Sequence, residues 1–140
     1  VQEWVPRALQ KGIDLGFELE DAWTSGDALL LKELLGNLID NSIAYTPRDG
    51  TVTVRTSSSD AKCILEIEDS GSGIPPSERD RVFERFYRMP GTSGDGCGLG
   101  LAIVREIADR HCATIELGSP PSGQGSRFRV IFPPLHVLQR

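Results

Sequence analysis

The sequence predicts an α/β fold, a two-layer sandwich of about three helices and a mixed, largely antiparallel five-stranded sheet. Two patterns carry this prediction. An apolar arc at the helical period runs through residues 31–45, and short stretches of alternating apolar and polar residues recur along the chain. The short connections between these stretches favour antiparallel pairing, and the helices are too few to cover both faces of a sheet.

The helices are expected from apolar periodicity and from residues that start or stop a helix. Ser25, Gly26 and Asp27 provide a turn and a cap for the longest one. That helix should end near Tyr45, because Pro47 disfavours helical geometry in the residue before it. The expected helices cover residues 1–11, 31–45, a short stretch near 78–86, and 99–112.

The strands are expected where apolar and polar side chains alternate. Phe17 and Leu19 alternate with glutamates in the first strand, and Val52 and Val54 face inward in the second. The expected strands cover residues 15–22, 51–56, 62–69, 114–117 and 127–132, with a hairpin loop at 57–61.

The composition is that of a single globular domain. The chain has 140 residues, of which 25% are charged and 39% hydrophobic, and its tryptophans, Trp4 and Trp23, are expected to be packing residues. A net charge of -5 disfavours a nucleic-acid partner, since phosphate binding needs clustered Lys and Arg. Three cysteines without a CxxC spacing are typical of a reducing cytoplasm and disfavour a metal centre. No apolar run is long enough to cross a membrane, and the start at Val1 indicates a piece of a longer protein.

Two asparagines on the longest helix are the first candidates for chemistry. Asn37 and Asn41 lie four residues apart, so they share a face at the margin of the apolar arc. Their amides offer an oxygen to a cation and N–H donors to an anion, which suits a metal–phosphate group. The alternative is a pair of polar residues capping a packed helix, and these two residues alone favour it.

Asp69 is the second candidate. It follows apolar residues at alternate positions, so the strand period turns its side chain toward the core, where a carboxylate needs donors. Gly71 and Gly73 in the following turn permit close approach by a flat ligand. Asp69 would then accept a hydrogen bond from an exocyclic amine such as N6 of adenine. Alternatively, it binds the backbone of its own turn.

A glycine-rich loop at residues 94–102 leads into the last helix. Backbone N–H groups and the helix dipole favour a phosphate at such a junction. The loop is neither a dinucleotide fingerprint nor a Walker A motif, because no parallel βαβ unit surrounds it and no Gly-Lys-Ser/Thr follows. By itself the loop is a weak signal.

Taken together, these stretches resemble the catalytic and ATP-binding domain of bacterial sensor histidine kinases, within the gyrase–chaperone–histidine kinase–MutL superfamily. The motifs NLIDN, DSGSGI, FERFYR and GCGLGLAIV carry the resemblance, which runs from about Phe17 to Phe132. It implies the Bergerat ATP-binding fold in one domain over residues 1–140. ATP would lie between the long helix and a lid over about residues 75–97.

The resemblance also implies roles for single residues. Asn41 would bind Mg²⁺, with Asn37 beside it near the phosphates, and Asp69 would anchor the adenine. Phe83 and Phe86 would pack the lid down over the nucleotide. The other nucleotide-binding positions that it implies are Tyr45, Gly71, Gly73, Ile74, Arg88, Gly96, Gly98, Leu99, Gly100, Leu101 and Ser126.

One position separates branches of this superfamily. Its ATPases carry a general-base Glu where this chain has Asn37, and an amide cannot take a proton from water near neutral pH. The resemblance therefore implies a histidine protein kinase, which transfers the γ-phosphate of Mg-ATP to a histidine on a dimerisation helix outside this chain. The alternatives are a water-hydrolysing ATPase and a non-catalytic ATP-binding or docking module. Ala44, where the family often has Lys or Arg, motivates the last of these.

The implied partners are the acceptor-histidine dimerisation domain of the same protein and a downstream response regulator. The domain itself is expected to be a monomer in the cytoplasm, and its parent a homodimer in the bacterial inner membrane. His111 is expected to be part of a helix end, since no acceptor motif surrounds it.

Overall fold

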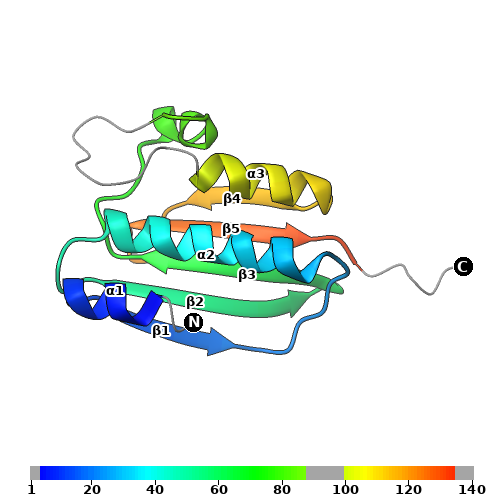
Figure 1. The fold of residues 1–140 in the computed structure, drawn as a ribbon, viewed down its shortest axis with the longest axis horizontal. Coiled ribbons are helices and arrows are strands. Elements are labelled where there is room, and N and C mark those ends of the chain that lie inside the picture. Colours follow the sequence, from blue (N-terminus) through cyan, green and yellow to red (C-terminus); the bar gives the residue numbers. More distant parts are fainter. Residues whose placement is uncertain (1–3, 88–99, 135–140) are drawn as a thin grey trace, which may run out of the picture.

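A computed structural model describes residues 4–87 and 100–134. Its helices and strands form two layers (Figure 1). The elements in chain order are α1 (Trp4–Lys11), β1 (Asp14–Leu19), α2 (Ala28–Tyr45), β2 (Thr51–Ser59), β3 (Lys62–Asp69), η1 (Pro76–Glu78), η2 (Arg81–Phe83), α3 (Gly100–Arg110), β4 (Thr114–Gly118) and β5 (Ser126–Phe132).

The strands form one five-stranded sheet in the order β1-β2-β3-β5-β4. β1 pairs parallel with β2, and the other neighbouring strands are antiparallel. The three α-helices lie together on one face of this sheet (Figure 1). The predicted two-layer sandwich with a mixed, largely antiparallel sheet is therefore confirmed. None of the helices in the described ranges is long and apolar enough to cross a membrane.

α2 supplies the centre of the core. The Asp27 carboxylate accepts hydrogen bonds from the backbone N–H groups of Leu29 and Leu30 at 2.9 and 3.2 Å. With this cap the helix begins at Ala28, earlier than predicted, and it ends before Pro47 as predicted. The α2 side chains that are buried against the sheet and the other helices are Leu34, Leu38, Ile39, Ser42 and Ile43.

β1 differs from its prediction in length and burial. It ends at Leu19, before the predicted limit at residue 22. It is an edge strand with a neighbour on one side only, and Leu19 is 65% exposed. Trp4 is buried, but Trp23 in the loop after β1 is 75% exposed. The expectation that Trp23 packs is therefore wrong, because Trp23 lies in an irregular segment, where no periodicity shows which side chains are buried.

The hairpin between β2 and β3 is tighter than predicted. β2 continues to Ser59, so the expected loop at residues 57–61 is reduced to Asp60 and Ala61. Both have positive φ, 53° and 65°, as in a two-residue type I′ turn. The usual signal for that turn is Asn-Gly or Asp-Gly, and alanine at the second position hides it. The helix expected near residues 78–86 is instead the pair of 3-10 turns η1 and η2, neither of which has a side-chain cap.

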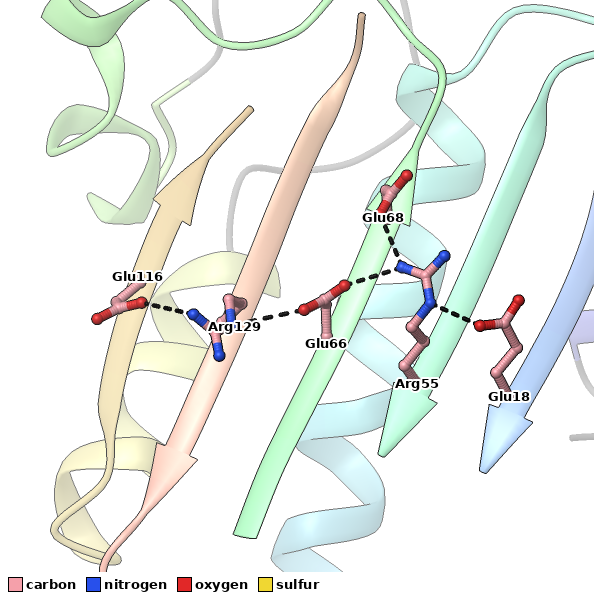
Figure 2. A network of polar contacts seen from close by, with 6 residues as sticks. All are labelled: Glu18, Arg55, Glu66, Glu68, Glu116 and Arg129. Atoms are coloured by element: carbon pink, nitrogen blue, oxygen red, sulfur yellow. Dashed lines mark hydrogen bonds and ion pairs between the residues drawn. The ribbon is translucent and has the colours of Figure 1, made fainter. Parts of the chain in front are cut away.

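A network of charged side chains covers the face of the sheet opposite the helices (Figure 2). Arg55 of β2 donates to three carboxylates at 2.7–2.8 Å, and Arg129 of β5 lies within 3.5 Å of two. Opposite charges at neighbouring cross-strand positions stabilise strand pairing, and a polar face suits contact with water. The four carboxylates, which come from β1, β3 and β4, are Glu18, Glu66, Glu68 and Glu116.

Candidate functional site

Asp69 ends β3 with its side chain in the interior, 3% exposed. Its Oδ1 accepts hydrogen bonds from the N–H groups of Gly71 at 2.9 Å and Ser126 at 3.3 Å, and its Oδ2 accepts one from Ser126 Oγ at 2.7 Å. The β3–β5 register places Asp69 opposite Ser126. Burial raises the pKa of the Asp69 carboxyl, and the hydrogen bonds from Ser126 and Gly71 oppose that rise. The carboxylate thus binds its own turn and, in addition, the neighbouring strand.

Glycines allow three backbone segments to meet beside Asp69. A Cβ on Gly71 would lie 2.7 Å from the carbonyl oxygen of Tyr45, at the end of α2. Gly73 has a φ of +83°, and a Cβ there would lie 2.9 Å from the Gly125 oxygen. A Cβ on Gly125, whose φ is +106°, would lie 1.8 Å from the Asp69 oxygen. Only residues without a side chain permit these approaches.

A hollow of about 370 Å³ opens beside this turn. Gln124 Nε2, on its rim, donates a hydrogen bond to the Gly71 oxygen at 2.6 Å. Sequence reasoning missed Gln124, although its position close before Ser126 was a signal that could have found it. The hollow is lined by Lys11, Ala44, Tyr45, Thr46, Pro47, Ser70, Gly71, Ser72 and Gln124.

Asn37 and Asn41 lie on α2, before the Tyr45 end that contacts the turn after Asp69, and both are partly buried. Asn37 Nδ2 donates to the Glu33 oxygen at 3.1 Å. Gly100, the first residue of α3, is so close to Asn37 that an added Cβ would lie 3.5 Å from its Oδ1. The N-terminus of α3 therefore faces this end of the candidate site. The predicted site residues outside the described ranges are Arg88, Gly96, Gly98 and Leu99, with part of the predicted lid.

α2 runs from the turn that follows Asp69 to the start of α3. Asn37, Asn41 and Tyr45 follow one another at intervals of four residues, so they span about 12 Å along one side of the helix. Gly71 lies against the Tyr45 end and Gly100 against the Asn37 end. The turn after Asp69 and the start of α3 therefore both lie against α2. The sequence could not show this, because the three segments are far apart along the chain.

The aromatic residues of the predicted lid differ from one another. Phe83 is buried and packs edge-to-face on Phe128, with ring centroids 6.2 Å apart, and the Arg105 guanidinium lies 4.5 Å from its ring centroid. Phe86 is 69% exposed, so the expectation that it packs the lid down is wrong for this conformation. Ile74 and Leu101, the other apolar site positions that fall within the described ranges, are buried.

His111 follows α3 and joins it to the start of α2. Its Nδ1 lies 2.8 Å from the Ile107 oxygen, and its Nε2 accepts a hydrogen bond from the Asp27 N–H at 3.1 Å. Both ring nitrogens are thus engaged at a helix end, where a structural role was expected.

Comparison with known proteins gives consistent matches. Residues 26–136 match the family described as histidine kinase-, DNA gyrase B-, and HSP90-like ATPase. The sensor protein kinase PmrB of Pseudomonas aeruginosa is 37% identical over 134 residues, which are 95% of this chain and 28% of PmrB. The chain thus spans less than a third of this longer relative.

Solved structures agree with the sequence match. The mycobacterial sensor histidine kinase MprB superposes with a TM-score of 0.81 at 31% identity, covering 96% of this chain and 97% of that one. Full-length ShkA, in complex with AMPPNP, superposes with a TM-score of 0.79 at 30% identity, covering 94% of this chain and 28% of that one. The chain therefore belongs to the histidine kinase-, DNA gyrase B- and HSP90-like ATPase family, as a catalytic and ATP-binding domain of the sensor histidine kinase branch.

Proposed function

We propose that this domain binds Mg-ATP along α2 and passes the γ-phosphate to a histidine on an acceptor domain of the same protein. The observation that carries the proposal is the hydrogen-bonding state of Asp69. A carboxylate offers about four lone-pair sites, and within the described residues it accepts hydrogen bonds from three donors of Gly71 and Ser126. The second lone pair of Oδ2 would accept a hydrogen bond from the exocyclic amine of adenine. Guanine would present a carbonyl oxygen there, so the site favours adenine.

The residues at the other end suit a magnesium triphosphate. The amide oxygen of Asn41 is a hard ligand of the kind that Mg²⁺ takes. The first turn of α3, beside Asn37, offers backbone N–H groups and the positive end of a helix dipole to phosphate oxygens. A bound Mg²⁺ would neutralise phosphate charge, which together with positioning is most of what phosphoryl transfer requires.

Transfer to histidine is favoured over hydrolysis by Asn37. Its Nδ2 donates to its own helix at Glu33, and an amide does not take a proton from water near neutral pH. An imidazole acceptor brings its own lone pair and needs no base. The complex of ShkA with AMPPNP, a 30% identical structure, supports nucleotide binding by the same fold.

The test has two stages. Calorimetric titration with AMPPNP should show binding that strengthens when Mg²⁺ is added, and absence of binding would overturn the proposal. The domain is then mixed with the acceptor domain of its parent protein and γ-labelled ATP, and an acid-labile phosphohistidine is expected. Rapid phosphate release without an acceptor would instead favour an ATPase. Normal binding with no transfer would favour a docking module, for which the absence of a cation at Ala44 is the motivation.

The remaining partners follow from the same proposal. A response regulator would receive the phosphate from the acceptor histidine. The parent protein would be a homodimer of the bacterial inner membrane, with this domain in the cytoplasm and monomeric by itself.

Adenosine affinity is expected to rise with pH. Burial raises the pKa of Asp69 above its ordinary value of 3.8, so between 3.8 and the raised pKa the folded protein holds a proton that the unfolded chain has lost. Protonation makes the Asp69 carboxyl a weaker hydrogen-bond acceptor, and the exocyclic amine of adenine favours its ionised form. Adenosine binding therefore releases a proton, and the affinity rises as the pH passes the raised pKa. Calorimetry at a series of pH values upward from about 4, near the ordinary pKa of an aspartate, checks this. For Asp69→Asn the profile should be flat, and an equal slope in both proteins would contradict the assignment.

The raised pKa of Asp69 affects stability in the direction opposite to its effect on adenosine binding. Between the unfolded and the raised folded pKa of Asp69, the native state binds more protons than the unfolded state. The contribution of this group to the free energy of unfolding therefore falls as pH rises through that window and is constant above it.

A further inference from the structure

We propose that Lys11 is a positioning residue for the purine end of the nucleotide site, which consists of Asp69 and the turn that contains Gly71. Lys11 acts on this end from α1, through the last turn of α2. This inference rests on the proposed function and names a residue that the site motifs do not contain. Lys11 lies at the end of α1, and its side chain reaches across to α2.

The Lys11 side chain contacts the last turn of α2. Lys11 Nζ donates hydrogen bonds to the carbonyl oxygens of Ile43 at 2.9 Å and Ala44 at 3.0 Å. The last carbonyls of an α-helix have no partner within the helix, and they carry the negative end of its dipole. One ammonium group therefore satisfies two such carbonyls and holds the end of α2 in place.

Further hydrogen bonds surround the contact of Lys11 with α2. Arg48 Nη2 donates to the Gln10 oxygen at 3.3 Å, and the Asp49 N–H donates to the Lys11 oxygen at 3.4 Å. These bonds join the end of α1 to the turn that follows α2. The end of α1, the last turn of α2 and this turn therefore form one hydrogen-bonded unit.

This hydrogen-bonded unit lies against the turn that follows Asp69. Gly71 is so close to the Tyr45 carbonyl that it has no room for a Cβ, and the Thr51 N–H donates to Ser70 Oγ at 2.9 Å. Gly71 in turn donates its N–H to Asp69 Oδ1. A shift in the last turn of α2 would therefore displace a donor of the carboxylate that recognises adenine.

The surroundings of Lys11 indicate that its ammonium group acts as a hydrogen-bond donor to α2. Burial lowers the pKa of its ammonium, and repulsion from Arg48 and Arg7 lowers it further. Its hydrogen-bond acceptors are carbonyl oxygens, so its role is to donate to them. Lys11→Met keeps most of the aliphatic stem and removes only the donors, whereas Lys11→Arg keeps donors.

Arg7 provides the matched control. It too joins α1 to α2, through an ion pair of Arg7 Nη1 with Asp40 Oδ1 at 2.7 Å, in which both side chains are about half exposed. This ion pair uses a side chain of α2 and not the carbonyl oxygens to which Lys11 donates. Arg7→Met therefore loosens the same two helices without freeing the carbonyls near Gly71.

The experiment measures adenosine and Mg-tripolyphosphate binding to the wild type and the variants by calorimetry. Lys11→Met should weaken adenosine binding about 3- to 30-fold, the range transmitted through packed elements, and leave tripolyphosphate binding unchanged. Arg7→Met and Lys11→Arg should bind adenosine like the wild type. If the Met variant does not fold, Lys11→Gln, which keeps an N–H₂ group, carries the same expectation with a smaller loss.

Three outcomes would overturn the inference: unchanged adenosine affinity in the folded variant, an equal loss in Arg7→Met, or an equal loss for tripolyphosphate. Failure of the wild type to bind adenosine nucleotides would instead overturn the proposed function. The two failures are therefore distinguishable.

Discussion

Gly125→Ala should lower the free energy of unfolding by about 2–5 kcal/mol. The φ of Gly125 is +106°, where an L side chain is strained, and an added Cβ would lie 1.8 Å from the backbone oxygen of Asp69. That oxygen belongs to the sheet and cannot move as a flexible side chain does. The methyl group must therefore displace the end of β3 or the turn before β5. Urea unfolding, with the change in midpoint at constant slope, measures the loss.

Alanine variants of Gly123 and Gly118, in the same region, distinguish the cost of backbone strain from the cost of the clash with Asp69. Gly123 also has a positive φ, +83°, but an added Cβ there meets nothing within 4 Å. Gly123→Ala should thus show the backbone strain alone, about 1–2 kcal/mol. Gly118→Ala, with open space and no positive φ, should change stability by less than about 0.5 kcal/mol. Equal losses at Gly123 and Gly125 would show that the contact with Asp69 has no influence.

Asp69→Asn should weaken adenosine binding by about 1.5–3 kcal/mol, the usual contribution of a charge-assisted hydrogen bond. Asn keeps an oxygen that can accept from the N–H groups of Gly71 and Ser126, and its amide can donate to Ser126 Oγ, whose hydroxyl rotates. The fold should therefore survive. The free acceptor is replaced by a donor that would face the amine of adenine.

The control for this variant is the neighbouring acid. Glu68→Gln removes a carboxylate one residue away on the opposite face of β3, where it pairs with Arg55. Its adenosine affinity should remain within about twofold of the wild type, because neighbouring residues of a strand point to opposite faces of the sheet and Glu68 therefore points away from Asp69. Calorimetry on both variants, with urea unfolding to match their stabilities, makes the comparison. Unchanged affinity in Asp69→Asn, or an equal loss in both, would remove adenine recognition from Asp69.

Long, regular elements were predictable because their signals are local. The apolar arc of α2, the proline that ends it and the alternation in β3 each lie within a few neighbouring residues. The tight Asp60–Ala61 turn was missed because its usual glycine is absent. The exposure of Leu19 and Trp23 was missed because Leu19 ends an edge strand and Trp23 lies in an irregular segment, and periodicity does not show what covers such side chains.

The class of fold, the polar face of α2 and the inward direction of Asp69 follow from the order of the residues alone, since all three depend on the helical period of 3.6 and the strand period of two. Which groups meet at the site depends instead on how the elements pack. Ser126 reaches Asp69 across 57 residues of chain, and Lys11 reaches Ile43 across 32. Such contacts leave no periodic trace, because they arise from the register of the sheet and from the packing of one helix end against another.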